Sequence, residues 1–199
     1  AEARPVMQRP VQNFRGRRAL LLMADDRNCR VLRDILEKLG VGPAGSGIVY
    51  AATDGMHRSL DGGATWTRGA HPDETQLFTG IAVEQRHPER AWVTGGSGVY
   101  RTTDAGTTWT ALPGVPRARA IAIDPSDESV AYVATDKELL RSADGFRTWT
   151  SLELPGAPAI AVAVSPGSPP LLWAGTDHGF CMIDLSAATP RCRRVIDTE

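Results

Sequence analysis

The sequence predicts a mainly all-β protein: a partial or small β-propeller of about four blades with four-stranded antiparallel sheets, preceded by a short β–α segment. The first observation is a motif, [Ser/Thr]-x-Asp-x-[Gly/Phe]-x-Thr-Trp, that occurs at Ser59–Trp66, Thr102–Trp109 and Ser142–Trp149. The second is its spacing, because the three aspartates stand 43 and 40 residues apart, which is typical of propeller blades. The third is a turn-rich composition with 20 Gly and 14 Pro.

The first 18 residues form a basic, extended arm in this prediction. Five arginines lie in it against a single acidic residue: Arg4, Arg9, Arg15, Arg17 and Arg18. Two interpretations stay open. The arm is either solvated, or it lies on a partner or an anionic membrane surface, where each basic residue contributes ~1 kcal/mol.

Residues 19–46 predict a strand followed by a helix. Ala19–Met23 is an apolar run typical of a buried strand, and apolar residues then recur at helical spacing from Val31 to Leu39. Gly40 is a natural helix stop. We expect the apolar face of this helix to pack on the repeats, which span residues 47–199, or on a partner.

Within each motif the residue types suit a tight turn. Asp and Ser/Thr side chains hydrogen-bond nearby backbone amides. Gly63 and Gly106 suit positions that need a positive φ, whereas Phe146 stands at that position in the third copy and predicts a different turn geometry there. The Trp then begins a new strand and packs under the turn.

The motif resembles the Asp-box, or BNR repeat, of sialidases, sortilin-type receptors, some glycoside hydrolases and the photosystem II stability/assembly factor family. The surrounding sequences, such as AWVTGGSGVYRTTDAGTTW, are most similar to the assembly-factor type. The resemblance implies that the motif lies on the outer turn of each blade and is structural rather than catalytic. Its residues are Ser59, Asp61, Gly63, Thr65, Trp66, Thr102, Asp104, Gly106, Thr108, Trp109, Ser142, Asp144, Thr148 and Trp149.

The strands follow from apolar runs between turns. In the first blade they are 48–52, 56–59 and 65–68; in the second 79–83, 91–94, 99–103 and 108–112; in the third 120–123, 130–134, 139–142 and 148–152; in the fourth 160–164, 171–174, 180–183 and about 191–196. The inner strand of the first blade is either missing or supplied by Ala19–Met23. Four blades leave three arrangements open: a small closed ring, an open arc covered by a partner, or a dimer that completes a larger ring.

The fourth copy has lost its turn motif. Asp184 follows Asp144 by 40 residues, but Met182 and Ser186 replace the Ser and Gly of the motif. Cys181 and Cys192 lie on adjacent predicted strands around this turn, and either a disulfide that staples it or two buried thiols fit their spacing. A disulfide would indicate an oxidising compartment.

No catalytic, cofactor-binding or metal-ligating set is predicted. Tyr50, Tyr100 and Tyr132 all fall on repeat strands and predict core packing, as do Trp92 and Trp173 at equivalent second-strand positions. The recurring arginines Arg58, Arg101 and Arg141 are expected to face solvent, with a convergent anion site as the alternative. The four histidines show no metal-ligand spacing.

These observations predict a non-catalytic protein-interaction scaffold. We expect a structural subunit or assembly/stability factor of a larger, membrane-associated complex, and the resemblance suggests a photosynthetic one. Its partners would be other protein subunits, including an integral membrane complex, on the periplasmic or lumenal side. A net charge of −1 argues against nucleic acid, and no apolar run is long enough to span a bilayer. The alternative is a carbohydrate-binding or sialidase-like protein derived from a glycoside hydrolase.

Overall fold

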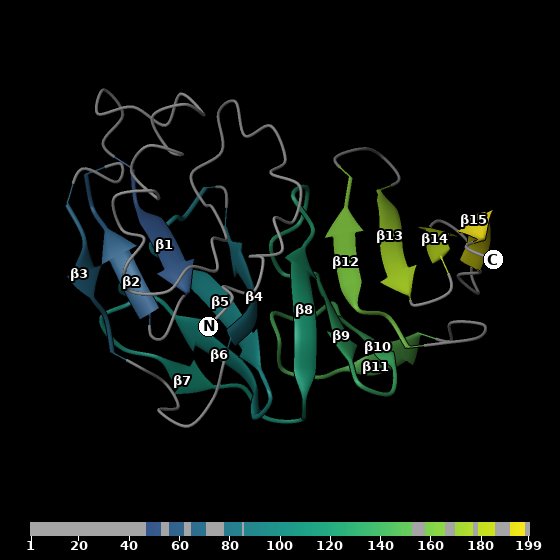
Figure 1. Ribbon diagram of the computed structural model, residues 1–199, viewed down its shortest axis with the longest axis horizontal. Helices are drawn as coiled ribbons and strands as arrows, with labels where there is room; N and C mark the ends of the chain where they lie inside the picture. Colours follow the sequence, from purple (N-terminus) through teal and green to yellow (C-terminus); the bar gives the residue numbers. More distant parts are fainter. Residues whose placement is uncertain are drawn as a thin grey trace, which may run out of the picture.

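In the computed structural model of Figure 1, the described residues form four antiparallel sheets that follow one another along the chain. It describes residues 47–52, 56–61, 65–70, 78–84, 86–152, 158–165, 170–176, 179–185 and 192–197. The predicted arm and the predicted strand–helix segment therefore lie outside the described residues.

Each sheet is one blade, and its strands neighbour one another in chain order. The first blade contains β1 (Val49–Ala52), β2 (Met56–Ser59) and β3 (Thr67–Arg68). The second contains β4 (Phe78–Val83), β5 (Ala91–Gly95), β6 (Gly98–Thr102) and β7 (Thr110–Ala111). The third contains β8 (Ala118–Ile123), β9 (Ala131–Thr135), β10 (Leu139–Ser142) and β11 (Thr150–Leu152). The fourth contains β12 (Ala161–Val164), β13 (Leu171–Thr176), β14 (Gly179–Asp184) and β15 (Cys192–Asp197).

The blades form an arc in which the first strands of successive blades lie side by side. In Figure 1, β4, β8 and β12 run along the inside of the arc, and the outer strands β3, β7, β11 and β15 lie at its rim. The predicted four-stranded blades are confirmed for the second, third and fourth sheets. In the first blade β1 pairs with β2 as β5 pairs with β6, so β1 is a second strand. The described residues contain no inner strand for this blade, and the prediction that Ala19–Met23 supplies one falls on residues outside them.

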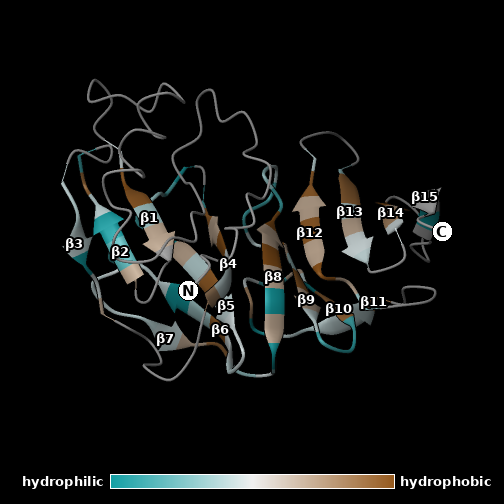
Figure 2. Cartoon of the chain, in the orientation of Figure 1, coloured by the Kyte–Doolittle hydropathy of each residue, from teal (hydrophilic) through white to brown (hydrophobic). Residues whose placement is uncertain are grey.

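Burial falls from the middle of each blade to its rim. All five residues of β5 and all five of β9 are buried, because these strands have a neighbouring strand on both sides and a neighbouring blade on both faces. Both residues of β3 and both residues of β7, the short rim strands, are exposed. Figure 2 accordingly shows hydrophobic residues concentrated in inner and second strands such as β8, β12 and β13.

The core lies between blades rather than within one. Trp92 and Val99 of the second blade share a buried cluster with Ala131, Val133 and Leu140 of the third. A second cluster joins the third and fourth blades and contains Tyr132, Leu139, Leu172, Ala174, Cys181 and Ile183. We call the sheet face that packs on the next blade the back face, and the opposite sheet face the front face.

Strand pairing in the fourth blade shows that Asp184 does not occupy the motif's Asp position, so that expectation was wrong. Tyr132 pairs with Arg141 in the third blade, and the equivalent Trp173 pairs with Met182 in the fourth. Met182 therefore stands where the other blades have arginine. By the same alignment Leu185, not Asp184, falls at the Asp position.

Candidate functional site

The three turn motifs share one hydrogen-bond pattern, which the second copy shows completely. The Thr102 hydroxyl donates to Asp104 Oδ1 (2.8 Å) and accepts the N–H of Gly106 (2.9 Å). Thr108 donates its N–H to Asp104 Oδ1 (2.9 Å) and its hydroxyl to Oδ2 (2.7 Å). Both carboxylate oxygens thus hold the turn shut.

The first and third copies use the same side chains. Thr65 donates its N–H to Asp61 Oδ1 at 2.8 Å, and Thr148 donates its N–H to Asp144 Oδ1 at 3.0 Å. Their hydroxyls donate to the second oxygen of the same carboxylates. Gly63 lies outside the described residues.

Phe146 was expected to change the geometry of the third turn, and this was wrong. Its φ is 71°, close to the 77° of Gly106 in the second copy, and its N–H donates to Ser142 Oγ at 3.0 Å. The ring of Phe146 stacks on Trp92 of the preceding blade, with centroids 4.7 Å apart. This contact offsets the left-handed conformation, which costs an L-residue about 1–2 kcal/mol.

The carboxylates of the turns titrate at unusually low pH. Hydrogen bonds from Ser59 and Thr65 lower the pKa of Asp61 to about 2, and those from Thr108 and Thr102 lower the pKa of Asp104 to about 2. Hydrogen bonds from Thr148 likewise lower the pKa of Asp144. Each carboxylate is thus committed, in its charged form, to holding a turn.

Aromatic side chains of the second strands are covered by the turn of the following blade. Tyr50 meets Trp109 edge to face at 6.4 Å, and its hydroxyl donates to Pro88 O at 2.9 Å. Phe146 lies between Trp92 and Trp149, so the next pair of blades repeats this arrangement. Burial raises the pKa of Tyr50 and of Tyr132, which makes both poor nucleophiles at neutral pH.

The arginines of the repeated series are half-buried and contact the protein itself, so the expectation that they face solvent was wrong. The alternative, a convergent anion site, stays a prediction. Arg58 reaches into the next blade and donates to Ala105 O (2.8 Å) and to Thr107 Oγ1 (2.5 Å). Arg101 lies over the Trp92 ring, 5.3 Å from its centroid. Arg141 donates from Nε to the Tyr132 hydroxyl at 3.4 Å. These arginines bind their own or the next blade.

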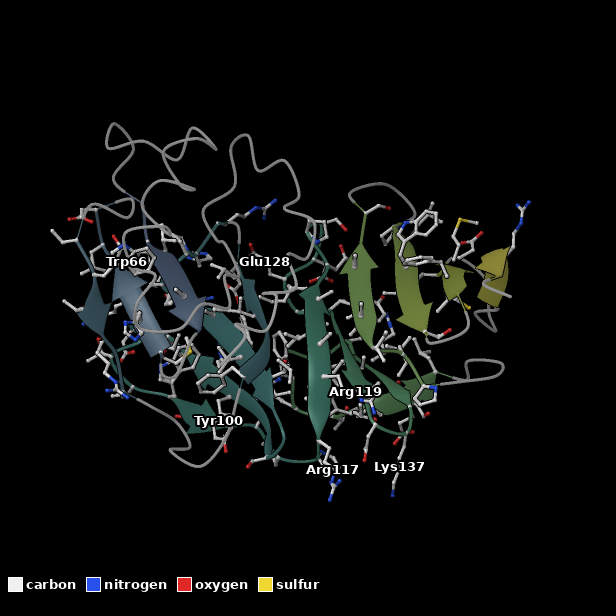
Figure 3. All side chains as sticks on the ribbon, in the orientation of Figure 1. Trp66, Tyr100, Arg117, Arg119, Glu128 and Lys137 are labelled. Atoms are coloured by element: carbon white, nitrogen blue, oxygen red, sulfur yellow. The ribbon has the colours of Figure 1, made fainter. Side chains whose placement is uncertain are left out.

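Three basic side chains lie at one end of the third blade, before and on β8 and in the turn between β9 and β10. Figure 3 shows Arg117, Arg119 and Lys137 along one edge of the arc, opposite the edge that carries Glu128. Arg117 is 75% exposed in its side chain, has a φ of 49° and lies 3.9 Å from Asp136. We call Arg117, Arg119 and Lys137 the loop-tip cations.

The loop-tip cations rest on fixed backbone. Thr135 accepts the N–H groups of Lys137 and Glu138 through its hydroxyl oxygen and donates to Glu138 O at 2.9 Å. Arg119 lies on β8 itself. Sequence reasoning missed this grouping, because Arg117 and Lys137 are 20 residues apart.

Cys181 is disulfide-bonded and buried in the interface between the third and fourth blades. Strand pairing puts Ile183 opposite Cys192, so Cys181 and Cys192 belong to the same sheet face. The side chain of Cys192 lies outside the described residues, as does Cys29, and the pairing of Cys181 with Cys192 stays a prediction. The five arginines of the N-terminal arm also lie outside them.

Other site chemistry is sparse in the part of the chain that the structure describes. Among those residues, no group of three His, Cys, Asp or Glu side chains is placed to hold a metal ion. Nor do they include a helix long and apolar enough to cross a membrane. Glu84 is buried, and its desolvation raises its pKa, but Arg90 Nη1 lies 3.3 Å from its carboxylate.

No protein-family model and no curated protein matches the sequence. Solved structures do match the fold. An ancestral GH74 enzyme superposes over 79% of this chain and 23% of its own, at 16% identity and a TM-score of 0.63. YCF48 bound to D1 peptide matches over 75% of this chain and 48% of its own, at 18% identity and a TM-score of 0.52.

A gluconolactonase from Xanthomonas campestris matches over 79% of this chain and 64% of its own, at 16% identity and a TM-score of 0.57. This chain thus spans between about a quarter and two thirds of the length of these structures. Together with the four antiparallel sheets, the matches show a β-propeller-type, all-β fold. The matching structures include both enzymes and a protein seen with a peptide. A function for this chain therefore has to be argued from its own residues and not from the shared fold.

Proposed function

We propose that this chain is a non-catalytic scaffold, a structural subunit or assembly/stability factor of a larger complex at a membrane. One observation carries the proposal: the described groups with a shifted pKa are tied into turns or into contacts within and between blades. Asp61, Asp104 and Asp144 close turns, and Tyr50 and Tyr132 are buried between blades. Active sites instead hold shifted groups free to meet a substrate.

The loop-tip cations are the surface that we assign to the partner. They are exposed or half-buried and stand on backbone that Thr135 and β8 hold in place, so binding does not require the backbone around them to become ordered. We further propose that the three turns are Asp-boxes, and that the chain is of the photosynthetic assembly-factor type. YCF48, which shares the fold, is seen with a D1 peptide, and this supports a protein partner.

The proposed location is the periplasmic or lumenal side of the membrane. The disulfide at Cys181 supports it, because disulfides persist in oxidising compartments. The predicted basic arm would add an electrostatic attraction to anionic lipid headgroups of the membrane that holds the partner complex.

The test is purification of the tagged chain from gently solubilised native membranes, followed by mass spectrometry of co-eluting chains. We expect membrane-protein subunits at fixed stoichiometry, lost on Arg117→Glu with Lys137→Glu. The matched control is Arg147→Glu, an exposed arginine on the third turn, which should leave binding unchanged. Equal recovery of the partner with both variants, or no partner at fixed stoichiometry, would reject the proposal.

A further inference from the structure

The back faces of successive blades repeat one pattern of side chains. In the second blade this face carries Trp92 on β5, and Arg101 pairs with it from β6; Val99 lies two residues earlier on β6. The third blade has Tyr132, Arg141 and Leu139 at these three positions. Trp92 and Val99 share a buried cluster with the third blade, and Tyr132 and Leu139 share one with the fourth. The exposure of Val99 is 1% and that of Leu139 is 0%.

The fourth blade keeps the apolar part of this pattern on its back face. No element among the described residues covers that face. Strand pairing puts Trp173 at the position of Trp92, Met182 at that of Arg101 and Phe180 at that of Val99. Phe180 is 52% exposed, and Ala161 and Ala163 on the inner strand of the same face are exposed as well. A contiguous apolar face of this kind marks an interaction site in a soluble protein.

We propose that this back face is the interface of a two-fold symmetric dimer, covered by the same face of a second copy of the chain. The replacement of arginine by Met182 argues for this occupant. A two-fold axis brings residues near its centre close to their own copies, so an arginine there would face an arginine. Met182 removes that repulsion and leaves a flexible apolar side chain that packs on an identical surface.

The charges at the border of the face also suit self-pairing. Arg193 pairs with Met182 across β14 and β15, and Asp184 lies two residues beyond Met182 on the same face. Both are exposed and carry opposite charges. One copy can therefore present its Arg193 toward the Asp184 side of the other, which fixes the relative orientation of the two sheets.

A head-to-tail arrangement of copies fits less well. It would require the back face of the fourth blade to cover the front face of the first blade in another copy. That front face is already buried, since Val49 is 4% and Ala51 is 2% exposed. The two-fold pairing needs only the face that is open, and it is independent of the partner surface formed by the loop-tip cations.

The experiment is sedimentation equilibrium on the full chain and three variants. Met182→Arg restores the residue that Arg58, Arg101 and Arg141 provide in the other blades, so the variant should fold. Phe180→Arg is the second test variant. Leu60→Arg is the control, because Leu60 is exposed to a similar extent but lies on the turn of the first blade.

We expect the wild type and Leu60→Arg to sediment at twice the chain mass. Each of the other two variants should raise the dissociation constant of the dimer at least about a hundredfold. A wild type that stays monomeric at every concentration overturns the proposal and leaves the face to another segment or partner. So does an assembly larger than two chains, or dimerisation that survives Met182→Arg in a variant with native circular dichroism.

Discussion

Phe146 occupies a backbone conformation that the second turn reserves for Gly106. Its φ of 71° is unfavourable for a side chain with a Cβ, yet the ring fills the space above Trp92. At Gly106 an added Cβ would lie 3.2 Å from the ring of Tyr50, so the corresponding space in the other interface is already occupied. The two residues are alternative ways to complete the same contact between blades.

Replacing Phe146 separates the ring contact from the backbone strain. Phe146→Ala loses the ring and keeps the strain, and should lower the free energy of unfolding by about 3 kcal/mol. Phe146→Gly also loses the ring but relieves the strain, and should be more stable than Phe146→Ala by about 1 kcal/mol. Urea unfolding measures both. If the glycine variant is the less stable of the two, the left-handed conformation is not strained.

The turn aspartates predict a loss of stability in acid. Their folded-state pKa lies below the unfolded value, so the charged form stabilises the fold above pH ~4, and this contribution disappears as the pH falls toward 2. We expect Asp104→Asn to lower stability at pH 6 and to flatten the dependence between pH 4 and 2, measured by urea unfolding.

Glu84 has the opposite sign and serves as the internal control. Its folded pKa is raised, so its ionisation costs stability as the pH rises above its ordinary value of 4.5. Glu84→Gln should therefore leave the acid-side loss unchanged. A pH dependence that is identical in wild type and Asp104→Asn would contradict the role given to the turn.

At the scale of the element, the second-strand aromatic joins a blade to the next, and in the first blade the third-strand arginine adds a second link. The Arg58 guanidinium donates to both Ala105 O and Thr107 Oγ1, and a lysine ammonium does not reproduce its planar donor geometry. Arg58→Met, which imitates the fourth blade, should lower the midpoint of thermal unfolding by about 2–4 °C, equivalent to ~1 kcal/mol. Arg58→Lys should recover only part of this, and an unchanged midpoint in Arg58→Met would mean that the contact contributes nothing.

The strands themselves could be predicted from the sequence, but their relation to the motif in the fourth blade could not. Counting 40 residues from Asp144 leads to Asp184, whereas strand pairing aligns Met182 with Arg141 and moves the position to Leu185. The difference is one residue added between the third and fourth blades. Counting the spacing between aspartates does not detect this extra residue. The third strands of both blades still alternate their side chains between the two sheet faces, so the sequence pattern looks unchanged.

The arginines show the same limit at the site. Their spacing correctly indicated one position repeated in the first three blades, but the choice between an anion site and solvent missed that Arg101 lies over Trp92. Which side chain lies above another depends on how neighbouring blades pack. The spacing of the arginines along the sequence does not predict that packing. The loop-tip cations were missed for the same reason.

At the scale of the whole molecule, each blade contacts only its neighbours, so local stability should vary along the array. Strands β9 and β13 make a matched pair, because each is a second strand with partners on both sides. They differ in the cover of the back face. Amide hydrogen exchange in the Met182→Arg variant should be slower in β9 than in β13, and equal protection would show that the array unfolds as one unit.

Coverage of each back face by the following blade gives the protein a direction during its synthesis. Trp92 leaves the ribosome before Phe146 and Trp149. The Trp92 ring therefore stays uncovered until those two residues have been synthesised. At about 5–20 residues per second this interval lasts on the order of 3–10 s. Each newly synthesised blade thus exposes an apolar back face until the next blade covers it. Chaperones that bind nascent chains would therefore find one such face per blade, at regular intervals along the chain.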